Sequence, residues 1–278
     1  MIGLSFAAPA VAAPALWKVS DADSSVWLFG SVHMLPPGTD WRTSYFDKVL
    51  AKADRVYLET DIGPEAQMRI TPLSMELGFS TGGVLLSDRV PSDVIDRMRE
   101  LANEYNVPMP LLLAMRPWMA ATTLSVGVLA DAGYDPNLGV EMIVTSEVPA
   151  ERMGYLESPE DQIGILAGGS DEEQVAMLVA TLDSAPAMQA DIDAMIDAWL
   201  GGHPEGLGDA FMAQMGGYHE DTMARLIDIR NSNWVEQIET MLADNESAFL
   251  IVGAAHLIGD VSVVKMLEDK GFSAQRMQ

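Results

Sequence analysis

Two short segments of the chain share one pattern that ends in a histidine. The segments LFGSVHML (residues 28–35) and IVGAAHLI (residues 251–258) each contain an apolar stretch, a glycine, two small or apolar residues and a histidine. Apolar stretches of this length before a glycine indicate strands that end at a turn. Ligands in open α/β sheets bind beyond the carboxyl ends of strands. The repeated pattern therefore predicts that His33 and His256 belong to one shared site, the alternative being two buried histidines that merely lie beside turns.

An acidic residue follows a third apolar stretch. Glu59 comes directly after residues 55–58, and Asp61, two residues later, could assist or replace it. Two histidines and a carboxylate are a suitable ligand set for Zn, Mn, Co or Fe, with positions left for water. Such an ion lowers the pKa of bound water and polarises a carbonyl, as hydrolysis requires. His33, His256 and Glu59 are thus the candidate metal ligands. As functional groups at strand ends, the histidines are expected to contribute little to the core.

The composition limits the classes of function that are open to the chain. The 278 residues include 41 Asp and Glu against 16 Lys and Arg, so the formal net charge is −25. This charge repels nucleic acid and anionic lipid, which makes both poor partners, and it attracts cations. The absence of cysteine excludes disulfides, thiolate metal sites and cysteine nucleophiles. A small molecule or a peptide is the expected substrate class, and the oligomeric state is left open.

The first residues have the pattern of an export signal. Small residues at Ala-x-Ala spacing occur at positions 8, 10 and 12, although a basic segment does not precede them. We expect residues 1–13 to be the remainder of a signal peptide, the alternative being a flexible Ala/Pro tail, and residues 14–278 to form a single domain. No apolar run approaches the roughly 20 residues of a membrane span, so an integral membrane protein is not expected. The expected location is periplasmic or secreted.

Short apolar stretches alternate with helical patterns, which predicts an α/β fold with a central mixed sheet, flanking helices and a large helical insertion. Residue 92 is the expected N-cap of the second helix, and Ser158 that of a helix beginning at Pro159. Strands are predicted at residues 25–29, 55–58, 152–156, 248–252 and 273–277. Helices are predicted at residues 44–53, 92–105, 118–130, 140–147 and 260–269, and over most of 171–242.

The paired Gly-x-x-His motifs and the segment ADRVYLE (residues 53–59) resemble the TraB/GumN family, which is related to the Tiki metalloproteases. Further matches, in order, are Arg116-Pro117-Trp118, Gly139-Val140-Glu141, Tyr155-Leu156-Glu157 with Gln162, and Arg230-Asn231 with Trp234. The resemblance runs from about Trp17 to the end of the chain. It implies an α/β fold like that of erythromycin esterase and ChaN-type proteins, with two pseudo-symmetric halves, and metal-dependent peptide hydrolysis activated by Mn or Co.

By position, the resemblance assigns His33 and His256 to the two motif histidines and Glu59 to the acidic residue. An arginine in a helical stretch is ordinarily solvated, but the family pattern makes Arg230 a candidate for orienting Glu59 or for holding an anionic group of the substrate. Glu141 and Glu157 are expected to make structural polar contacts. His219 is expected at the surface, with a place near the substrate as the alternative, and His203 in a loop.

Three functions remain open from the sequence. The first is a metal-dependent hydrolase, a peptidase by resemblance, in which Glu59 is a ligand or the general base. The second is a non-catalytic binding or regulatory protein that retains the site. The third is an esterase-like hydrolase that uses no metal and takes a histidine as its general base. All three predict the same residues in the site, so the sequence does not distinguish them.

Overall fold

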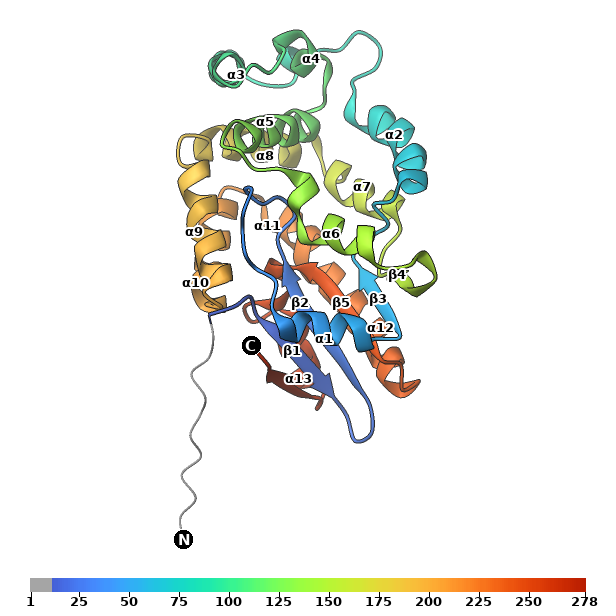
Figure 1. Cartoon of the computed structure of the whole chain (residues 1–278). Helices are drawn as coiled ribbons and strands as arrows, with labels where there is room; N and C mark the ends of the chain where they lie inside the picture. The colour runs from blue at the N-terminus through green and yellow to red at the C-terminus, as the bar shows by residue number, and fades with distance from the viewer. Residues whose placement is uncertain (1–11) are drawn as a thin grey trace.

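The structure is a computed structural model that describes residues 12–278. Within these residues six strands form one sheet in the order β4-β3-β5-β2-β1-β6 (Figure 1). The predicted leader at residues 1–13 lies almost wholly outside the described residues. The strands are β1 (Leu16–Ser20), β2 (Ser25–Ser31), β3 (Arg55–Leu58), β4 (Met153–Tyr155), β5 (Ala248–Gly253) and β6 (Ser273–Arg276).

The sheet is mixed, and its parallel part carries both Gly-x-x-His motifs. Strands β4, β3, β5 and β2 run parallel to one another, whereas β1 is antiparallel to both β2 and β6. In the pairing of β2 with β5, Ser31 lies opposite Gly253, and Leu58 of β3 lies opposite Ile251. The carboxyl ends of three strands that are distant in sequence therefore lie side by side.

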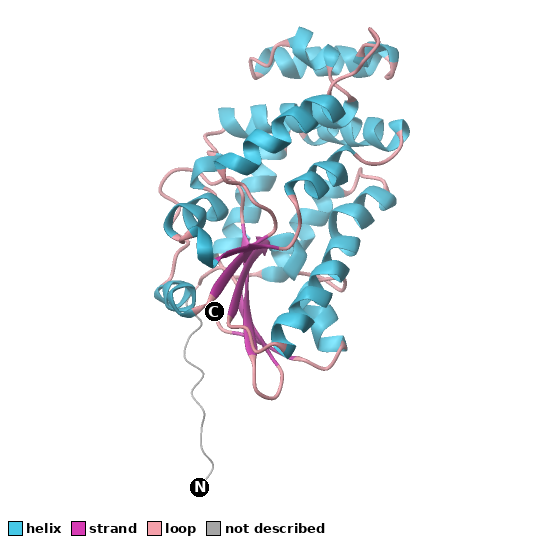
Figure 2. Cartoon of the chain, turned by 90° about the vertical axis from the view of Figure 1, so that its right-hand side faces the viewer, coloured by secondary structure: helices cyan, strands magenta, loops and turns pink. Residues whose placement is uncertain are grey.

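Helices cover both faces of the sheet because each face is apolar (Figure 2). On one face α1 (Ser44–Lys52), α6 (Val140–Glu147) and α9 (Met188–Leu200) pack their apolar sides around Phe29 and Phe249. On the other face α12 (Ile229–Ala243) and α13 (Val263–Asp269) pack around Leu28, Leu250 and Val252. The result is a helix–sheet–helix arrangement with the strand ends held between the two helical layers.

A helical insertion extends beyond the strand ends, at the top of Figure 1. Its own core contains Met98, Leu112, Leu124 and Leu178. Two helices of the insertion begin at a serine N-cap. Ser158 caps α7, and Ser170 caps α8 through a reciprocal capping box. Its helices are α2 (Pro64–Gly78), α3 (Ser92–Glu104), α4 (Met109–Ala114), α5 (Pro117–Asp131), α7 (Pro159–Ala167) and α8 (Asp171–Ser184).

The predicted α/β fold with a mixed sheet, flanking helices and a helical insertion is confirmed. The predicted strands agree with β2 to β6 to within two residues at each end. Residue 92 is not the N-cap of α3, because it is already the first residue of the helix. The N-cap is Pro91, and no side chain caps the helix start. The last helix begins at Val263, later than predicted, with Ser262 as its N-cap. No helix in residues 12–278 has the length and hydropathy of a membrane span.

Candidate active site

Four polar residues follow the carboxyl ends of four parallel strands. Glu59 comes directly after β3 and Glu157 two residues after β4, while His33 follows β2 and His256 lies in the 3-10 turn η5 (Ala254–Leu257) after β5. The glycines of the motifs allow these turns to touch. A Cβ atom on Gly30 would lie 3.0 Å from the Cα atom of Ala254, so a side chain there would push the turns apart. The sheet therefore gathers the polar groups at one edge.

A contact between two loops explains why Glu141 reaches His33. A Cβ atom on Gly139 would lie 2.1 Å from the carbonyl oxygen of His33, so only glycine permits this approach. The backbone N–H of Val140 donates to the carbonyl oxygen of Val32 at 3.2 Å, which fixes the start of α6 against the His33 loop. Glu141, in the first turn of α6, then lies with Oε1 2.9 Å from Nδ1 of His33. It also accepts a hydrogen bond from the Ser31 hydroxyl.

The His33–Glu141 pair resembles the base and orienting carboxylate of many hydrolytic enzymes. The Glu141 carboxylate raises the pKa of His33 to about 9, against the opposing effect of desolvation. The His33 side chain is 64% exposed, so its ring is accessible from outside. Because Nδ1 binds Glu141, the reactive nitrogen is Nε2. A Cβ atom on Gly253 would lie 3.5 Å from this nitrogen and 3.2 Å from Oε1 of Glu59, which places both groups around Gly253.

Arg230 is the centre of a buried charge network. Its Nη2 donates to Oε2 of Glu59 at 2.6 Å and to Oε2 of Glu157 at 2.9 Å, and its Nε donates to Oε1 of Glu157 at 2.8 Å. The guanidinium also lies 4.8 Å from the ring centre of Trp234. Arg230 is therefore buried and orients Glu59, the first of its two expected roles. Its Nη1 donates to the carbonyl oxygen of Leu226 at 3.3 Å. Glu157 makes the structural polar contact that was expected of it.

His256 is held as a neutral imidazole beneath this network. Nδ2 of Asn231 donates to the carbonyl oxygen of Val261 at 2.7 Å, which leaves Oδ1 of Asn231 to accept from Nδ1 of His256 at 2.6 Å. The proton is therefore on Nδ1, and Nε2 accepts from Nη1 of Arg230 at 3.1 Å. Burial lowers the pKa of His256 to about 4.

The expectation that both motif histidines contribute little to the core is wrong for one of them. His256 is only 4% exposed, and its ring centre lies 4.4 Å from that of Trp234. His33, by contrast, is open to the outside. The two histidines thus occupy equivalent positions in sequence but different environments in the structure. His256 is part of the buried network, and the ring of His33 is accessible at the pocket.

Glu59 is ionised at neutral pH. Burial opposes its charge, but His256, Arg230, His33 and the backbone N–H of Gly253 outweigh burial and lower the pKa of Glu59 to about 2. The N–H of Gly253 donates to Oε1 at 2.6 Å. A carboxylate this acidic is a weak general base at neutral pH. Glu59 thus presents a fixed negative charge next to His33.

These groups line a pocket of about 450 Å³. His33, Glu59, Glu141 and Arg230 belong to its lining, whereas His256 lies behind them. Its apolar lining comes from Leu58, Ile62, Pro136, Met142, Ile165, Leu166 and Leu226. The pocket therefore combines a charged wall with an apolar one.

Sequence reasoning gave no role to three polar residues of this pocket, Thr60, Gln67 and Gln162. Gln162 donates to Oε2 of Glu59 at 3.4 Å; it was noticed as a motif residue but given no role. Thr60 follows Glu59 directly, is 5% exposed and has a buried hydroxyl without a hydrogen-bond partner. Buried polar groups ordinarily have partners, so an unpaired hydroxyl at a pocket is a feature of binding sites. Its position after the strand-end glutamate was the available signal.

The predicted metal ligands do not fit a divalent ion as they are arranged here. Among residues 12–278, the ligand atoms of His33, Glu59 and His256 do not come together as a group of three that could share an ion. Nε2 of His256 lies 3.8 Å from Oε1 of Glu59, but it faces the guanidinium of Arg230. The positively charged guanidinium of Arg230 thus occupies the position that a metal ion bound by Glu59 and His256 would take.

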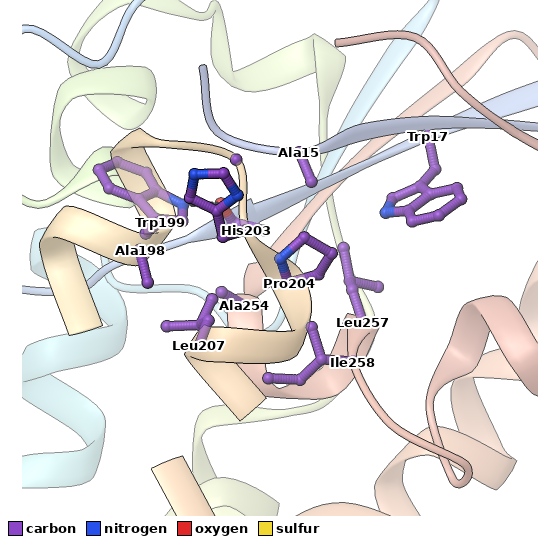
Figure 3. A pocket seen from close by; sticks show the side chains of 12 residues that line it. Ala15, Trp17, Ala198, Trp199, His203, Pro204, Leu207, Ala254, Leu257 and Ile258 are labelled. Carbon is purple, nitrogen blue, oxygen red and sulfur yellow. Dashed lines mark hydrogen bonds between the residues drawn. The ribbon is translucent and has the colours of Figure 1, made fainter. Parts of the chain in front are cut away.

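The other candidates from the sequence lie elsewhere. Asp61 accepts from the N–H of Gly63 at 2.8 Å and shapes the turn before α2. His203 precedes α10 (Pro204–Met215) and lies beside Trp199 and Pro204 at a small cavity of about 20 Å³ (Figure 3). His219 is exposed, and its Nδ1 accepts from the N–H of Asp221 at 3.2 Å. The expected loop position of His203 and surface position of His219 agree with the structure.

Comparison with known proteins agrees with the family that the motifs indicate. The model of the TraB/PrgY/gumN family matches residues 15–276. An uncharacterized protein of Treponema pallidum (strain Nichols) is similar, with 21% identity over 272 residues, which cover 91% of this chain and 80% of the relative. No solved structure shows a significant match to the chain. Because the family model matches almost the whole length, this chain belongs to the TraB/PrgY/GumN family.

Proposed function

We propose that this protein is a hydrolase that cleaves a carbonyl compound, with a peptide as the substrate class. The observation that carries the proposal is the pairing of an exposed His33 with a buried Glu141 at a pocket of about 450 Å³. A histidine whose Nδ1 is bound to a carboxylate is oriented for proton transfer at Nε2. The esterase-like alternative from the sequence, with a histidine as general base, is thus the mechanism that this geometry supports best.

The proposed reaction begins with His33 in its neutral form. Nε2 removes a proton from water as the water attacks the substrate carbonyl, and the Glu141 carboxylate stabilises the imidazolium that forms. His33 then returns the proton to the leaving nitrogen or oxygen. Glu59 has a pKa of about 2 and is held by Arg230, so it orients water or substrate rather than accepting the proton. Arg230 acts through Glu59 as a positioning residue.

The shape of the pocket supports a substrate with an apolar group. Met142, Ile165 and Leu226 line the pocket together with the charged groups. A bound chain could place its carbonyl near His33 while an apolar side chain contacts these residues, which removes apolar surface from water. The buried hydroxyl of Thr60 is a further group that binding could satisfy. Peptides with aliphatic side chains are therefore the first substrates to test.

The metal-dependent form of this reaction, implied by the resemblance to Tiki proteases, needs an arrangement in which Arg230 has left Nε2 of His256. Metal chemistry and the His33–Glu141 mechanism predict different responses to chelation. We expect purified protein to hydrolyse members of a mixed peptide library, with cleavage followed by mass spectrometry. Treatment with EDTA should leave the rate unchanged, and added Mn, Co or Zn should not increase it.

The controls for this experiment separate the remaining functions. Loss of cleavage on chelation, restored by one of the three ions, would replace the proposed mechanism with the metal-dependent one. Absence of cleavage from every library member, combined with measurable binding of one of them, would support the binding-protein function instead. His33→Gln is the control for contaminating peptidases, since their activity would persist in this variant.

We also propose that the protein is exported to the periplasm or secreted. The proposal depends on the Ala-x-Ala spacing at positions 8, 10 and 12. N-terminal sequencing of the protein from its native host should find a first residue near Ala13 to Ala15. A soluble cytoplasmic protein that retains Met1 would contradict it.

A further inference from the structure

A second hollow, larger than the candidate active site, lies on the other side of the His256 turn. It is a groove of about 900 Å³ between α10, the π-helix η4 (Ala224–Asp228), η5 and α13. It has no lining residue in common with the pocket around His33. Trp17, Pro204, Leu257 and Ile258 mark its edge, where it adjoins the small cavity beside His203 (Figure 3). The proposed hydrolysis does not use this groove.

The surface of the groove is apolar and rich in methionine. Its three methionines, Met212, Met215 and Met223, come from α10 and from the short helix α11 (Glu220–Met223), and Met212 is 59% exposed. Phe211 and Ile227 extend the apolar surface. Methionine side chains are flexible and polarizable, and surfaces built from them adapt to apolar side chains of different shapes. The groove thus resembles the surfaces that receive the apolar side of an amphipathic helix.

Acidic side chains, called the acidic rim below, also line the groove. The lining contains six carboxylates, Glu205, Asp209, Glu220, Asp228, Asp260 and Glu268. Its one lysine, Lys265, forms an ion pair with Asp269, so it does not offset these charges. Charges arranged in this way around a concave apolar surface attract and orient a cationic ligand.

We propose that the groove binds a cationic amphipathic peptide as a helix. The apolar side of the helix would contact the methionines, and its Lys or Arg side chains would reach the acidic rim. A second copy of this chain is disfavoured because each copy carries a net charge of −25 and the rim is acidic. Anionic lipid and nucleic acid are disfavoured for the same reason. Charge complementarity therefore selects the class of partner.

The groove and the candidate active site share a wall. In the π-helix η4, Leu226 lines the pocket of His33, whereas Ile227 and Asp228 line the groove. Arg230 is the second residue of α12, which begins directly after η4. Extra residues in a helical turn, as in a π-helix, occur frequently at functional sites. The proposal nevertheless concerns binding, and it is tested without any measurement of hydrolysis.

The test uses fluorescence anisotropy with a labelled peptide of about 14 residues, roughly four helical turns. Its leucines are spaced three and four residues apart so that they share one face of the helix, and its lysines occupy the opposite face. We expect saturable one-to-one binding to the full chain. Binding should weaken by at least about tenfold between about 0.05 M and about 0.5 M salt, since exposed charges are screened. A peptide with glutamate in place of lysine, and a scrambled peptide of identical composition, should both bind at least about tenfold more weakly.

Variants locate the binding on the chain. The rim variant Glu205→Gln, Asp209→Asn and Glu220→Gln should lose about tenfold or more in affinity, as expected when complementary charges are removed. A matched variant, Asp131→Asn, Glu151→Gln and Glu172→Gln, makes the same change of net charge at exposed positions outside the groove and should bind as the wild type does. Met212→Ser, at an exposed methionine, should also weaken binding without altering thermal unfolding.

Equal loss of affinity in the rim and matched variants would show that net charge alone attracts the peptide, which overturns the proposal. Equal binding of the lysine and glutamate peptides would overturn it as well. A dimer that appears in sedimentation and is abolished by Met212→Ser would mean that a second copy covers the groove, again contrary to the proposal. Binding that depends on both the rim and Met212 supports it.

Discussion

We expect Arg230→Met to lower the free energy of unfolding by about 3–5 kcal/mol at pH 7, the usual cost of removing one partner from a buried ion pair. The guanidinium contacts Glu59, Glu157 and His256; Glu59 is buried with it, and the side chain of Glu157 is 10% exposed. Methionine fills much of the space but removes the guanidinium charge from both carboxylates. Urea denaturation at several pH values measures the effect.

The pH dependence identifies the cause of this loss. The pKa of Glu59 is lowered to about 2 in the folded protein, so ionised Glu59 contributes stability above its ordinary value of 4.5 and loses it as the pH falls towards 2. Without Arg230 the folded pKa of Glu59 rises. The difference between variant and wild type should thus be largest above about pH 5 and should narrow in acid.

Arg97→Met is the matched control because Arg97 pairs with Asp183 at the surface, where both side chains are at least 38% exposed. Exposed pairs contribute about 0–1 kcal/mol, so this variant should be close to wild type. An Arg230→Met variant with a similarly small loss at pH 7 would contradict the central place of Arg230 in the network.

His33→Gln has the largest expected effect on activity. Glutamine can hydrogen-bond to Glu141 but cannot act as a general base, so kcat should fall roughly 10²–10⁴-fold on the best peptide of the library. The temperature of thermal unfolding should decrease by less than in Arg230→Met: the buried Glu141 loses its charged partner, but the His33 side chain is 64% exposed and packs little. His219→Gln, at a histidine with a half-exposed side chain outside the pocket, is the control and should retain full activity.

A fall in kcat for His33→Gln accompanied by a loss of stability as large as that of Arg230→Met would assign His33 a structural role. Full activity in His33→Gln would remove it from the reaction altogether. His256→Gln offers the reverse comparison: His256 is buried against Asn231 and Trp234, so this change should destabilise the protein as well as impair the site.

The central sheet could be predicted because β2, β3 and β5 contain short apolar runs that are followed by a glycine or an acidic residue. Two elements gave weaker signals. Strand β1 (Leu16–Ser20) follows the small-residue segment directly, and its sequence LWKVS does not stand out from a leader end. Helix α2 (Pro64–Gly78) has no side-chain cap, contains Pro72 in its interior and buries only Ala66 and Gly78, so it lacks an apolar stripe.

The candidate site was predictable in its location but not in its chemistry. Parallel strand ends lie at one edge of a sheet, so His33, Glu59 and His256 could be brought together from the sequence. The partnership of Glu141 with His33 depends on the close approach of Gly139 to the His33 loop, which joins segments about a hundred residues apart. The difference between the two histidines depends on α12, whose Trp234 and Asn231 cover His256 alone.

The pH profile of kcat/KM for wild type and Glu141→Gln tests the His33–Glu141 mechanism most directly. Glu141 raises the pKa of His33 to about 9, and only neutral His33 accepts a proton, so wild-type activity should increase with pH above the ordinary histidine value of 6.5. Glu141→Gln keeps the shape and removes the charge, so the pKa of His33 should fall and the rising part of the profile should move to lower pH, with a lower plateau. An unchanged profile in Glu141→Gln would contradict the mechanism.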